Sequence, residues 1–486
     1  MIEKIIPPIA PILVESTRSV GYSFEAAVAD IIDNSISKQA KNIYIYCGSN
    51  APQYLAVIDD GMGMSKDGLI NAMKYGSRSS MEERDSDDLG RFGLGLKMAS
   101  LSQCRKLTVI SSQNGRISGA CWDLDHIIKT ENWSLLILDD GEINKTIYID
   151  KLKHLNSGTI VLWENFDRIA EETINSNKVF NNNMLRTRGH IALVFHRYLS
   201  DKDAISIYLN NDKIEPMDPF FTNYPATQQL EEEIRTIAGN IIKIRPYILP
   251  YISKLSKKDR ELVNGYDGVK LNQGFYVYRN RRLIIWGTWF RMTKRHELKQ
   301  LTRIKVDIPN TMDSLWEIDI KKSTASIPEV IKKELRIILD KAVLKSEKVY
   351  TYRGRITGND DLEHVWNIVA ERDNKIGYYI NRENILYKKI VQSLEEDTCK
   401  IFEIFLKQIE ALFPYQDVYT RLLKNYDSVQ SPVIDKDELY QTLYSMLYDV
   451  ADTKRVKIVL KDLEKNEIFT SHQDIIKKLK EDFKYE

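Results

Sequence analysis

Three glycines and a lysine stand close together in residues 89–101, LGRFGLGLKMASL. Glycine permits positive φ angles and lets the backbone approach a ligand closely. A glycine-rich loop that enters a helix offers free backbone N–H groups and a favourable dipole to an anion. Gly90, Gly93, Gly95 and Lys97 therefore predict a phosphate-binding loop. The loop is not the usual P-loop, because no Gly-Lys-Ser/Thr sequence ends it.

A carboxylate and an amide stand four residues apart in the segment 23–38, SFEAAVADIIDNSISK. Residues at this spacing share one face of a helix, so Asp30 and Asn34 would lie one above the other. Such a pair could activate a water molecule and bind a metal ion. A solvated polar face of a surface helix explains the same spacing.

A third candidate group follows a predicted strand. Residues 42–47 and 54–58 are rich in β-branched and aromatic side chains, which favours strands. The second of these runs is followed by Asp59-Asp60-Gly61-Met62-Gly63-Met64. An acidic residue before two glycines suits a loop around a ligand, and a tight turn uses the same residue types.

Predicted helices and strands surround these residues. Ser23 is the predicted N-cap of a helix at 23–38, whose apolar stripe consists of Phe24, Ala27, Val28, Ile31, Ile32 and Ile36. Further strands are predicted at 106–112, 117–124, 134–139 and 159–165. The polar, highly charged residues 77–88 predict a mobile loop directly before the glycine-rich stretch.

Four motifs in a fixed order carry a resemblance to a known family. They are DIIDN (30–34), DDGMG (59–63), LGRFGLGLK (89–97) and SGT (157–159). Together they resemble the GHKL ATPases, a superfamily that includes gyrase, the ninety-kilodalton heat-shock chaperone, histidine kinases and MutL-type repair proteins. The chain is most similar to MORC ATPases and their bacterial relatives. The resemblance covers residues 23 to about 160 and implies a Bergerat-fold α/β sandwich.

The resemblance also implies ATP and Mg²⁺ as cofactors. Asn34 would coordinate Mg²⁺, Asp59 would accept a hydrogen bond from the exocyclic amine of adenine, and Lys97 would contact the phosphates. One protein ligand is enough for Mg²⁺, which keeps several waters and phosphate oxygens. The implied nucleotide-contacting set is Asn34, Asp59, Gly61, Gly63, Met64, Gly90, Gly93, Gly95, Leu96 and Thr159.

One position departs from the family pattern. The water-activating residue of ATP-hydrolysing members is usually Glu, and here Asp30 stands at that place. Asp30 can still act as a general base, so slow hydrolysis is the expectation. Glu25 and Asp33 are secondary candidates that solvation or a structural role also explains. A scaffold or chaperone that binds nucleotide with negligible hydrolysis is the alternative function.

The middle of the chain resembles the transducer domain of MutL-like proteins. Residues 184–199 predict a helix, 274–287 a strand with basic residues, and 316–328 a strand that ends in Lys321-Lys322. In the resemblance, one lysine at the strand end senses the γ-phosphate, and the sequence does not decide between Lys321 and Lys322.

Basic and aromatic residues also alternate near 276–295, where they would suit either nucleic-acid binding or an exposed basic strand face. The group consists of Tyr276, Tyr278, Arg279, Arg281, Arg282, Trp286, Trp289, Arg291, Lys294 and Arg295.

The length of 486 residues predicts several domains. The predicted class is α+β, with an ATP-binding domain at 1–215, a transducer-like α/β domain at 216–348 and a mainly helical region at 349–486. In the last region, 362–380 predict a short helix and a strand, and 384–412 and 436–451 predict amphipathic helices.

The composition of the chain bears on its expected partners and cellular compartment. The net charge of +1 gives no overall preference for nucleic acid. Four widely spaced cysteines predict reduced thiols in the cytoplasm, and no segment approaches the length of a membrane span.

By resemblance, the loop 77–88 would be a lid that closes over ATP, and ATP would bring two copies of the chain together as a homodimer. The same resemblance implies DNA or defence proteins as partners, in a bacterial DNA-directed or anti-phage system. A histidine kinase is not the expected function, because it would need a dimerising helix with a phosphoacceptor His before the ATP-binding domain, which begins here near residue 10.

Overall fold

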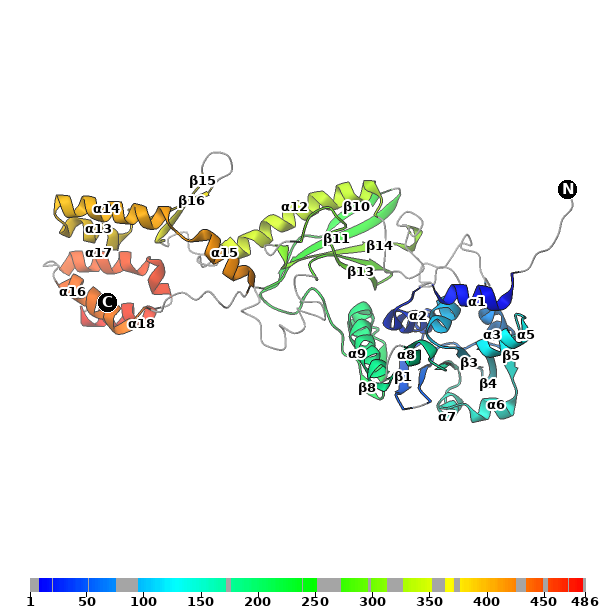
Figure 1. Cartoon of the computed structure of the whole chain (residues 1–486). Helices are drawn as coiled ribbons and strands as arrows, with labels where there is room; N and C mark the ends of the chain where they lie inside the picture. Colours follow the sequence, from blue (N-terminus) through cyan, green and yellow to red (C-terminus); the bar gives the residue numbers. More distant parts are fainter. Residues whose placement is uncertain are drawn as a thin grey trace, which may run out of the picture. The chain divides into compact units, whose positions relative to one another are not determined.

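The computed structural model describes residues 8–19, 21–50, 52–75, 95–171, 176–237, 239–250, 272–295, 299–312, 327–351, 363–370, 376–424, 434–448, 453–470 and 472–483. Contacts between residues divide the chain into two compact units, Met1–Thr351 and Tyr352–Glu486. The first unit contains two large β-sheets, and the second contains a short β-hairpin and a group of helices (Figure 1).

Eight strands form the first sheet, in the order β5-β4-β3-β6-β2-β1-β7-β8. Their bounds are β1 Asn42–Gly48, β2 Tyr54–Asp59, β3 Lys106–Gln113, β4 Arg116–Asp123, β5 Leu136–Leu138, β6 Gly158–Glu164, β7 Ser206–Leu209 and β8 Asp212–Lys213. Neighbouring strands are antiparallel, except β1 and β7, which are parallel. The six strands that the sequence predicts in residues 42–165 are all present, which confirms the α/β sandwich.

Helices cover both faces of the first sheet (Figure 1). The larger core lies under α1 Ala10–Arg18, α2 Phe24–Ser37, α4 Gly95–Gln103, α5 Leu124–Thr130 and α9 Ser176–Val194. The opposite face carries α6 Asp140–Lys145 and α7 Ile149–Lys153. The shorter helices are α3 Lys66–Met73, α8 Asp167–Glu171 and α10 His196–Ser200.

The helix α2, which carries Asp30 and Asn34, forms for the reasons that its sequence indicates. The Ser23 hydroxyl accepts a hydrogen bond from the backbone N–H of Ala26, and Glu25 lies in the first turn beside the positive end of the dipole. Its apolar stripe is buried against the sheet, with Ile36 partly buried. The predicted helix is therefore confirmed, and its burial fixes where the polar face points.

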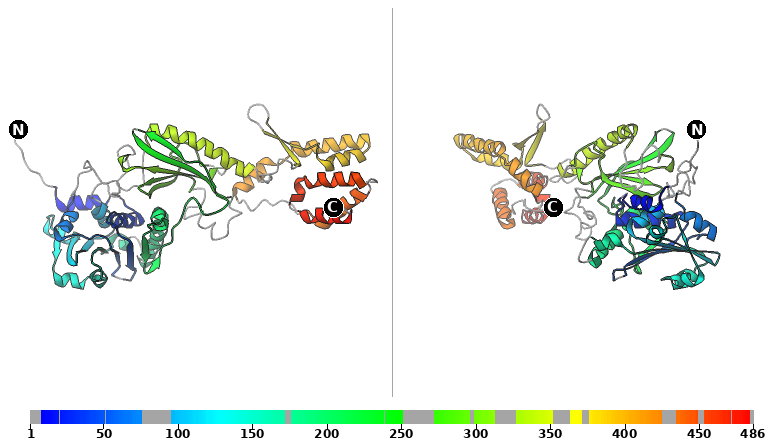
Figure 2. Two further views of the ribbon diagram at one scale, coloured as in Figure 1. Left: turned by 180° about the vertical axis from the view of Figure 1, so that it is seen from behind. Right: turned by 45° about the vertical axis from the view of Figure 1, so that its right-hand side comes forward.

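The second sheet contains six strands, in the order β10-β11-β14-β12-β13 with β9 beside β11. Their bounds are β9 Gln228–Gln229, β10 Glu233–Ile237, β11 Asn240–Ile248, β12 Gly274–Arg279, β13 Arg282–Thr288 and β14 Thr302–Ile308. A short 3₁₀ helix, Asn310–Met312, follows β14. The long helix α12, Glu329–Thr351, packs on one face of this sheet in every view (Figures 1 and 2).

The prediction of one strand at 274–287 is wrong. The segment is a hairpin of β12 and β13, joined by a turn in which Asn280 and Arg281 have φ values of 48° and 68°. Two residues at positive φ match the twist of a tight hairpin, and Asn tolerates this conformation. Arg rarely adopts it, so the pair Asn280-Arg281 does not resemble a typical hairpin turn in the sequence.

The strand β12 is buried on both faces. Phe275 and Val277 pack in the core beneath α12, whereas Tyr276 and Tyr278 belong to the core of the first sheet. The two tyrosines are 1% and 0% exposed, and Trp289 is buried as well. The expectation that these three rings stack on nucleic acid is therefore wrong, because the two tyrosines pack in the core of the first sheet and Trp289 packs in the core beneath α12.

Two further predicted elements differ in detail. The helix predicted at 184–199 consists of α9 and α10, which are separated at Phe195. The strand predicted at 316–328 lies largely outside the described residues, which resume at Ile327.

The second unit contains β15 Trp366–Ala370, β16 Ile376–Ile380, α13 Ile385–Ser393, α14 Glu396–Ala411, α15 Tyr415–Lys424, α16 Lys436–Tyr448, α17 Thr453–Glu464 and α18 Gln473–Asp482. The short helix predicted within 362–380 is wrong where the chain is described, because β15 and β16 pair as a hairpin there. Residues 384–412 form two helices rather than one. Within the described part of the chain, none of the helices has both the length and the apolar character needed to cross a membrane.

Candidate nucleotide-binding site

Asp30 lies inside the protein and not on a solvated helix face. The residue is 7% exposed, and the Tyr22 hydroxyl donates a hydrogen bond of 3.1 Å to its Oδ2 atom. A Cβ atom on Gly95 would lie 3.8 Å from the same oxygen, so the start of α4 borders the carboxylate. Asn34, one turn later in α2, is exposed. The solvated-face interpretation is therefore wrong for Asp30, although it still describes Asn34.

A residue that the sequence did not single out for this site reaches it from the second sheet. Arg282 begins β13, and its Nε lies 2.7 Å from both carboxylate oxygens of Asp33. Its Nη2 lies 3.9 Å from Oδ1 of Asp30. These contacts confirm the structural interpretation of Asp33. A contact between residues 249 positions apart leaves no local signal in one sequence.

Asp59 ends β2 with its carboxylate held from two sides. The residue is 5% exposed, the Ser35 hydroxyl donates to its Oδ2 at 2.7 Å, and the Gly61 N–H donates to its Oδ1 at 3.0 Å. Burial raises the pKa of this carboxyl to about 6, and the hydrogen bond from Ser35 opposes part of that shift. Because Ser35 follows Asn34 in α2, the Asp59 carboxylate lies beside the helix that carries Asn34.

The adjacent Asp60 has a different role. Its carboxylate accepts hydrogen bonds from the backbone N–H groups of Lys41 and Asn42 and from the Asn42 side chain, at 2.7 to 2.9 Å. These bonds tie the end of β2 to the start of β1. Asp60 therefore has a structural role between the two strands, and of the two neighbouring aspartates only Asp59 stays a candidate for the site.

Glycine at position 63 is required by a close backbone contact. Gly63 has a φ of +64°, and a Cβ atom there would lie 1.8 Å from the carbonyl oxygen of Ser112. A Cβ atom on Gly61 would lie 2.8 Å from the Lys38 carbonyl oxygen and 2.9 Å from the Asp59 carboxylate. The loop after β2 can thus pack against β3 and the end of α2 because these residues have no side chain.

Thr159 is linked to the loop after β2 through the hydroxyl group of Ser111. The hydroxyl groups of Thr159 and Ser111 lie 2.9 Å apart, and Ser111 Oγ accepts a hydrogen bond of 2.9 Å from the Met64 N–H. Ser111 also donates to the Gly158 carbonyl oxygen at 3.0 Å. Ser111 is not among the predicted site residues, although a serine within the apolar run KLTVISS is a sequence signal for such a role.

Lys97 is buried on α4, where its residue is 1% exposed. Its ammonium donates a hydrogen bond of 2.9 Å to the Ala72 carbonyl oxygen. Burial lowers the pKa of Lys97 to about 8, because removing the ammonium from water disfavours the charged form. Leu96, the preceding residue, is partly buried. The phosphate contact predicted for Lys97 stays a prediction.

Several predicted site residues lie outside the described part of the chain. They are Gly90 and Gly93 of the glycine-rich stretch, the predicted lid 77–88, and Lys321 and Lys322. Within the described part, α2 contacts the end of β2 and the start of α4, and residues of β3 and β6 contact the loop after β2 or one another. Asn34 offers an amide oxygen on the exposed side of α2, and this donor fits Mg²⁺, which prefers oxygen ligands.

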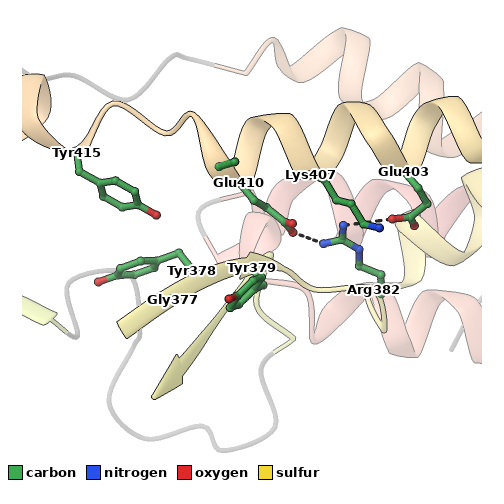
Figure 3. A pocket seen from close by; sticks show the side chains of 9 residues that line it. Gly377, Tyr378, Tyr379, Arg382, Glu403, Lys407, Glu410 and Tyr415 are labelled. Carbon is green, nitrogen blue, oxygen red and sulfur yellow. Dashed lines mark hydrogen bonds and ion pairs between the residues drawn. The ribbon is translucent and has the colours of Figure 1, made fainter. Parts of the chain in front are cut away.

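A separate pocket of about 630 Å³ belongs to the second unit (Figure 3). Arg382 lies between Glu410 and Glu403, with Nη2 3.2 Å from Glu403 Oε2. The Tyr387 hydroxyl also donates to Glu403. These pairs satisfy the charges of the arginine and both glutamates within the pocket, so a structural ion-pair network explains them.

Comparison with known proteins agrees with this geometry. Residues 22–159 match the family described as histidine kinase-, DNA gyrase B-, and HSP90-like ATPase. The chain is 28% identical over 94 residues to the ATPase morc-1 of Caenorhabditis elegans. It is 27% identical over 169 residues to the DNA mismatch repair protein MutL of Buchnera aphidicola subsp. Schizaphis graminum (strain Sg).

The matched stretches make up 19% and 32% of this chain and span 11% and 28% of those two relatives. The family match begins at Tyr22, which bonds to Asp30, and ends at Thr159. It therefore includes α2, the loop after β2 and the start of α4. Residues 22–159 therefore carry a domain of the GHKL ATPase type.

Proposed function

We propose that this chain binds ATP beside α2, the end of β2 and the start of α4, and hydrolyses it slowly to ADP and phosphate. The observation that carries the proposal is the buried Asp59 carboxylate, held by the Ser35 hydroxyl and the Gly61 N–H. A carboxylate fixed in this way can accept a hydrogen bond from the exocyclic amine of adenine without reorienting. The family match over the same residues supports ATP as the ligand.

Asn34 would hold Mg²⁺, which neutralises phosphate charge when it is bound. Lys97 and the glycines at 90, 93 and 95 would contact the phosphates in this proposal. The low pKa of Lys97 agrees with such a role, because an anionic phosphate nearby would restore the charged form that burial disfavours.

Asp30 would act as the general base. It would take a proton from a water molecule whose oxygen attacks the γ-phosphorus, and the bond from that phosphorus to the bridging oxygen would break. ADP leaves with the electron pair of that bond. Asp is one methylene shorter than Glu, so its carboxylate reaches less far toward the water, and we expect slow turnover. Negligible turnover would leave the nucleotide-regulated scaffold as the function.

A titration of the chain with ATP in the presence of Mg²⁺ tests the binding site. Replacement of Asp59 by Ala should weaken ATP affinity about 10- to 100-fold, because a charge-assisted hydrogen bond is lost. The matched control is Asp60→Ala, which removes a neighbouring carboxylate of the scaffold. Equal weakening in both variants would count against the assigned role of Asp59.

Phosphate release under steady-state conditions tests hydrolysis in the same preparation. The wild-type chain should release phosphate above the level of both Asp30→Ala and Asn34→Ala. If the wild type binds ATP and its rate does not exceed that of the two variants, the hydrolysis claim fails and the scaffold function is favoured.

We further propose that ATP brings two copies of the chain together, as the resemblance to GHKL proteins implies. A role in DNA-directed or anti-phage defence depends on that resemblance alone. DNA binding stays a prediction, and the burial of Arg279 and Arg282 removes two of the cations on which it relied. Titration with duplex DNA at several salt concentrations would test it, since phosphate contacts weaken steeply as salt rises.

A further inference from the structure

We propose that Arg282 is a positioning residue for ATP hydrolysis, which sets the orientation of the Asp30 carboxylate from the second sheet. The inference rests on the proposed function, because it assigns Asp30 the role of general base. It adds a residue outside the family match, which ends at Thr159.

Arg282 contacts two carboxylates that are three residues apart in α2. Its Nε is 2.7 Å from the oxygens of Asp33, and its Nη2 is 3.9 Å from Oδ1 of Asp30. The three side chains are 6%, 3% and 8% exposed, so water screens these charges weakly. The Tyr22 hydroxyl bonds the other oxygen of Asp30, Oδ2. Arg282 and Tyr22 thus engage opposite oxygens of the candidate base.

The guanidinium of Arg282 is itself held in place. It lies over the ring of Phe195, 5.2 Å from the centroid, and its Nη1 donates to its neighbour Leu283 at 3.1 Å. The turn before it is anchored, because the Tyr198 hydroxyl donates to the Asn280 carbonyl oxygen. A fixed cation can hold a carboxylate in one rotamer, whereas a mobile lysine on the surface could not.

His190 also lies near this cation, packed on Trp286 with ring centroids 5.6 Å apart. Desolvation, together with the charge of Arg282, lowers the pKa of His190 to about 3. The imidazole is therefore neutral at physiological pH and does not compete with Arg282 for the carboxylates.

This arrangement makes the position of a base in α2 depend on the second sheet. If Arg282 moves with β13, Asp33 and Asp30 lose a shared cation, and repulsion between the two carboxylates can turn Asp30 away from the water. A small displacement of a base costs a large factor in rate. ATP binding uses Asp59 and the loop after β2, which Arg282 does not contact in the described structure, so affinity should change little.

The test compares two double variants in the full chain. Arg282→Gln with Asp33→Asn replaces the Arg282–Asp33 ion pair by two neutral amides that can still bond, and it keeps the Asp30 carboxylate. The control is Arg197→Gln with Asp307→Asn, which neutralises another ion pair between α10 and β14. Each removes one ion pair between a helix and a strand of the second sheet, and the first alone removes the cation beside Asp30. Steady-state kcat and KM for ATP are measured for each.

We expect kcat of the Arg282/Asp33 double variant to fall on the order of tenfold to 100-fold, with KM within about twofold of the wild type. The control should keep both constants. Arg282→Lys, which retains the charge, should recover part of kcat. Equal kcat in the wild type and the Arg282/Asp33 variant, or an equal loss in the control, would overturn the positioning role and leave a structural clamp. Absence of wild-type hydrolysis would instead overturn the proposed function and this inference together.

Discussion

At the scale of single residues, the site depends on charges held away from water. Asp59 is buried where its pKa is raised to about 6, and Lys97 is buried where its pKa is lowered to about 8. Both groups would gain partners from a nucleotide: an amine for the carboxylate and a phosphate for the ammonium. The chain without nucleotide therefore carries unfavourable burial that ATP would relieve, which ties affinity to stability at these two positions.

The free energy of unfolding should reveal the cost of burying Asp59. Between the ordinary pKa of 3.8 and the folded value of about 6, the folded state binds more protons than the unfolded state. Stability from this group therefore falls as pH rises through that window, by about 3 kcal/mol in total. The Asp59→Asn variant should lack this pH-dependent change in the free energy of unfolding. Urea unfolding of both proteins from about pH 4 to 7.5 measures it, and parallel pH profiles would contradict the raised pKa.

Gly63 gives a second prediction at this scale. Ala at this position would need a Cβ atom 1.8 Å from the Ser112 carbonyl oxygen, so the loop after β2 must shift and ATP affinity should fall. Gly115→Ala is the matched control, because Gly115 has a φ of +75° with open space around its Cβ position. The control should cost about 1–2 kcal/mol of stability from backbone strain alone. Calorimetry and ATP titration of both variants would show whether Gly63→Ala costs more, and equal effects would contradict the contact.

At the scale of elements, α2 and β13 depend on each other through Asp33 and Arg282. Removing one partner of a buried ion pair leaves an uncompensated charge, which costs about 3–5 kcal/mol. We therefore expect Arg282→Ala to lower the free energy of unfolding by this amount. The Arg282→Gln/Asp33→Asn double variant should lose less, since it leaves no charge at position 33. Urea unfolding measures both, and an equal loss would show that the ion pair is not what stabilises this contact.

The elements also show how far the sequence could predict the site. Local signals were sufficient for α2, where Ser23 and the apolar stripe determine the helix, and for the strands that flank Asp59. They failed at the β12–β13 turn, because Arg281 adopts a positive φ that is uncommon for arginine. They also failed for Arg282, since its partners lie in a distant segment and a buried arginine resembles a surface one in the sequence.

The burial of Asp30 also depends on residues outside its own helix, so the local sequence did not predict it. Its spacing from Asn34 allowed a solvated helix face, and the residues that cover it come from elsewhere. Tyr22 precedes the helix, and Arg282 belongs to the other sheet. The spacing within one helix and the family resemblance therefore indicated Asp30 as the candidate base, and contacts from outside the helix determine its surroundings.

At the scale of the whole molecule, the proposed ATP-dependent homodimer is the claim with the widest consequences. Sedimentation velocity should show a larger species with ATP and Mg²⁺ than with ADP. Asn34→Ala should stay in the smaller form, because a site that does not hold Mg²⁺ binds ATP poorly. A size that is independent of nucleotide would contradict dimerisation by ATP.

The same measurement separates the two candidate sensor residues, which lie outside the described residues. Lys321→Ala and Lys322→Ala, examined one at a time, should differ in ATP-dependent association, because one lysine is expected to reach the γ-phosphate. The variant of the sensing residue should lose association, and the other should keep it. Wild-type association in both variants would remove the sensor role.

The most direct test of the account is a single-turnover measurement with ATP already bound. Wild-type chain in excess over ATP should convert it slowly to ADP and phosphate. Asp30→Asn, which keeps the size of the side chain, should bind ATP with similar affinity and react about 100-fold more slowly, since it cannot accept the proton of water. Equal rates in the two proteins, or no conversion by the wild type, would contradict the assignment of Asp30 as the base.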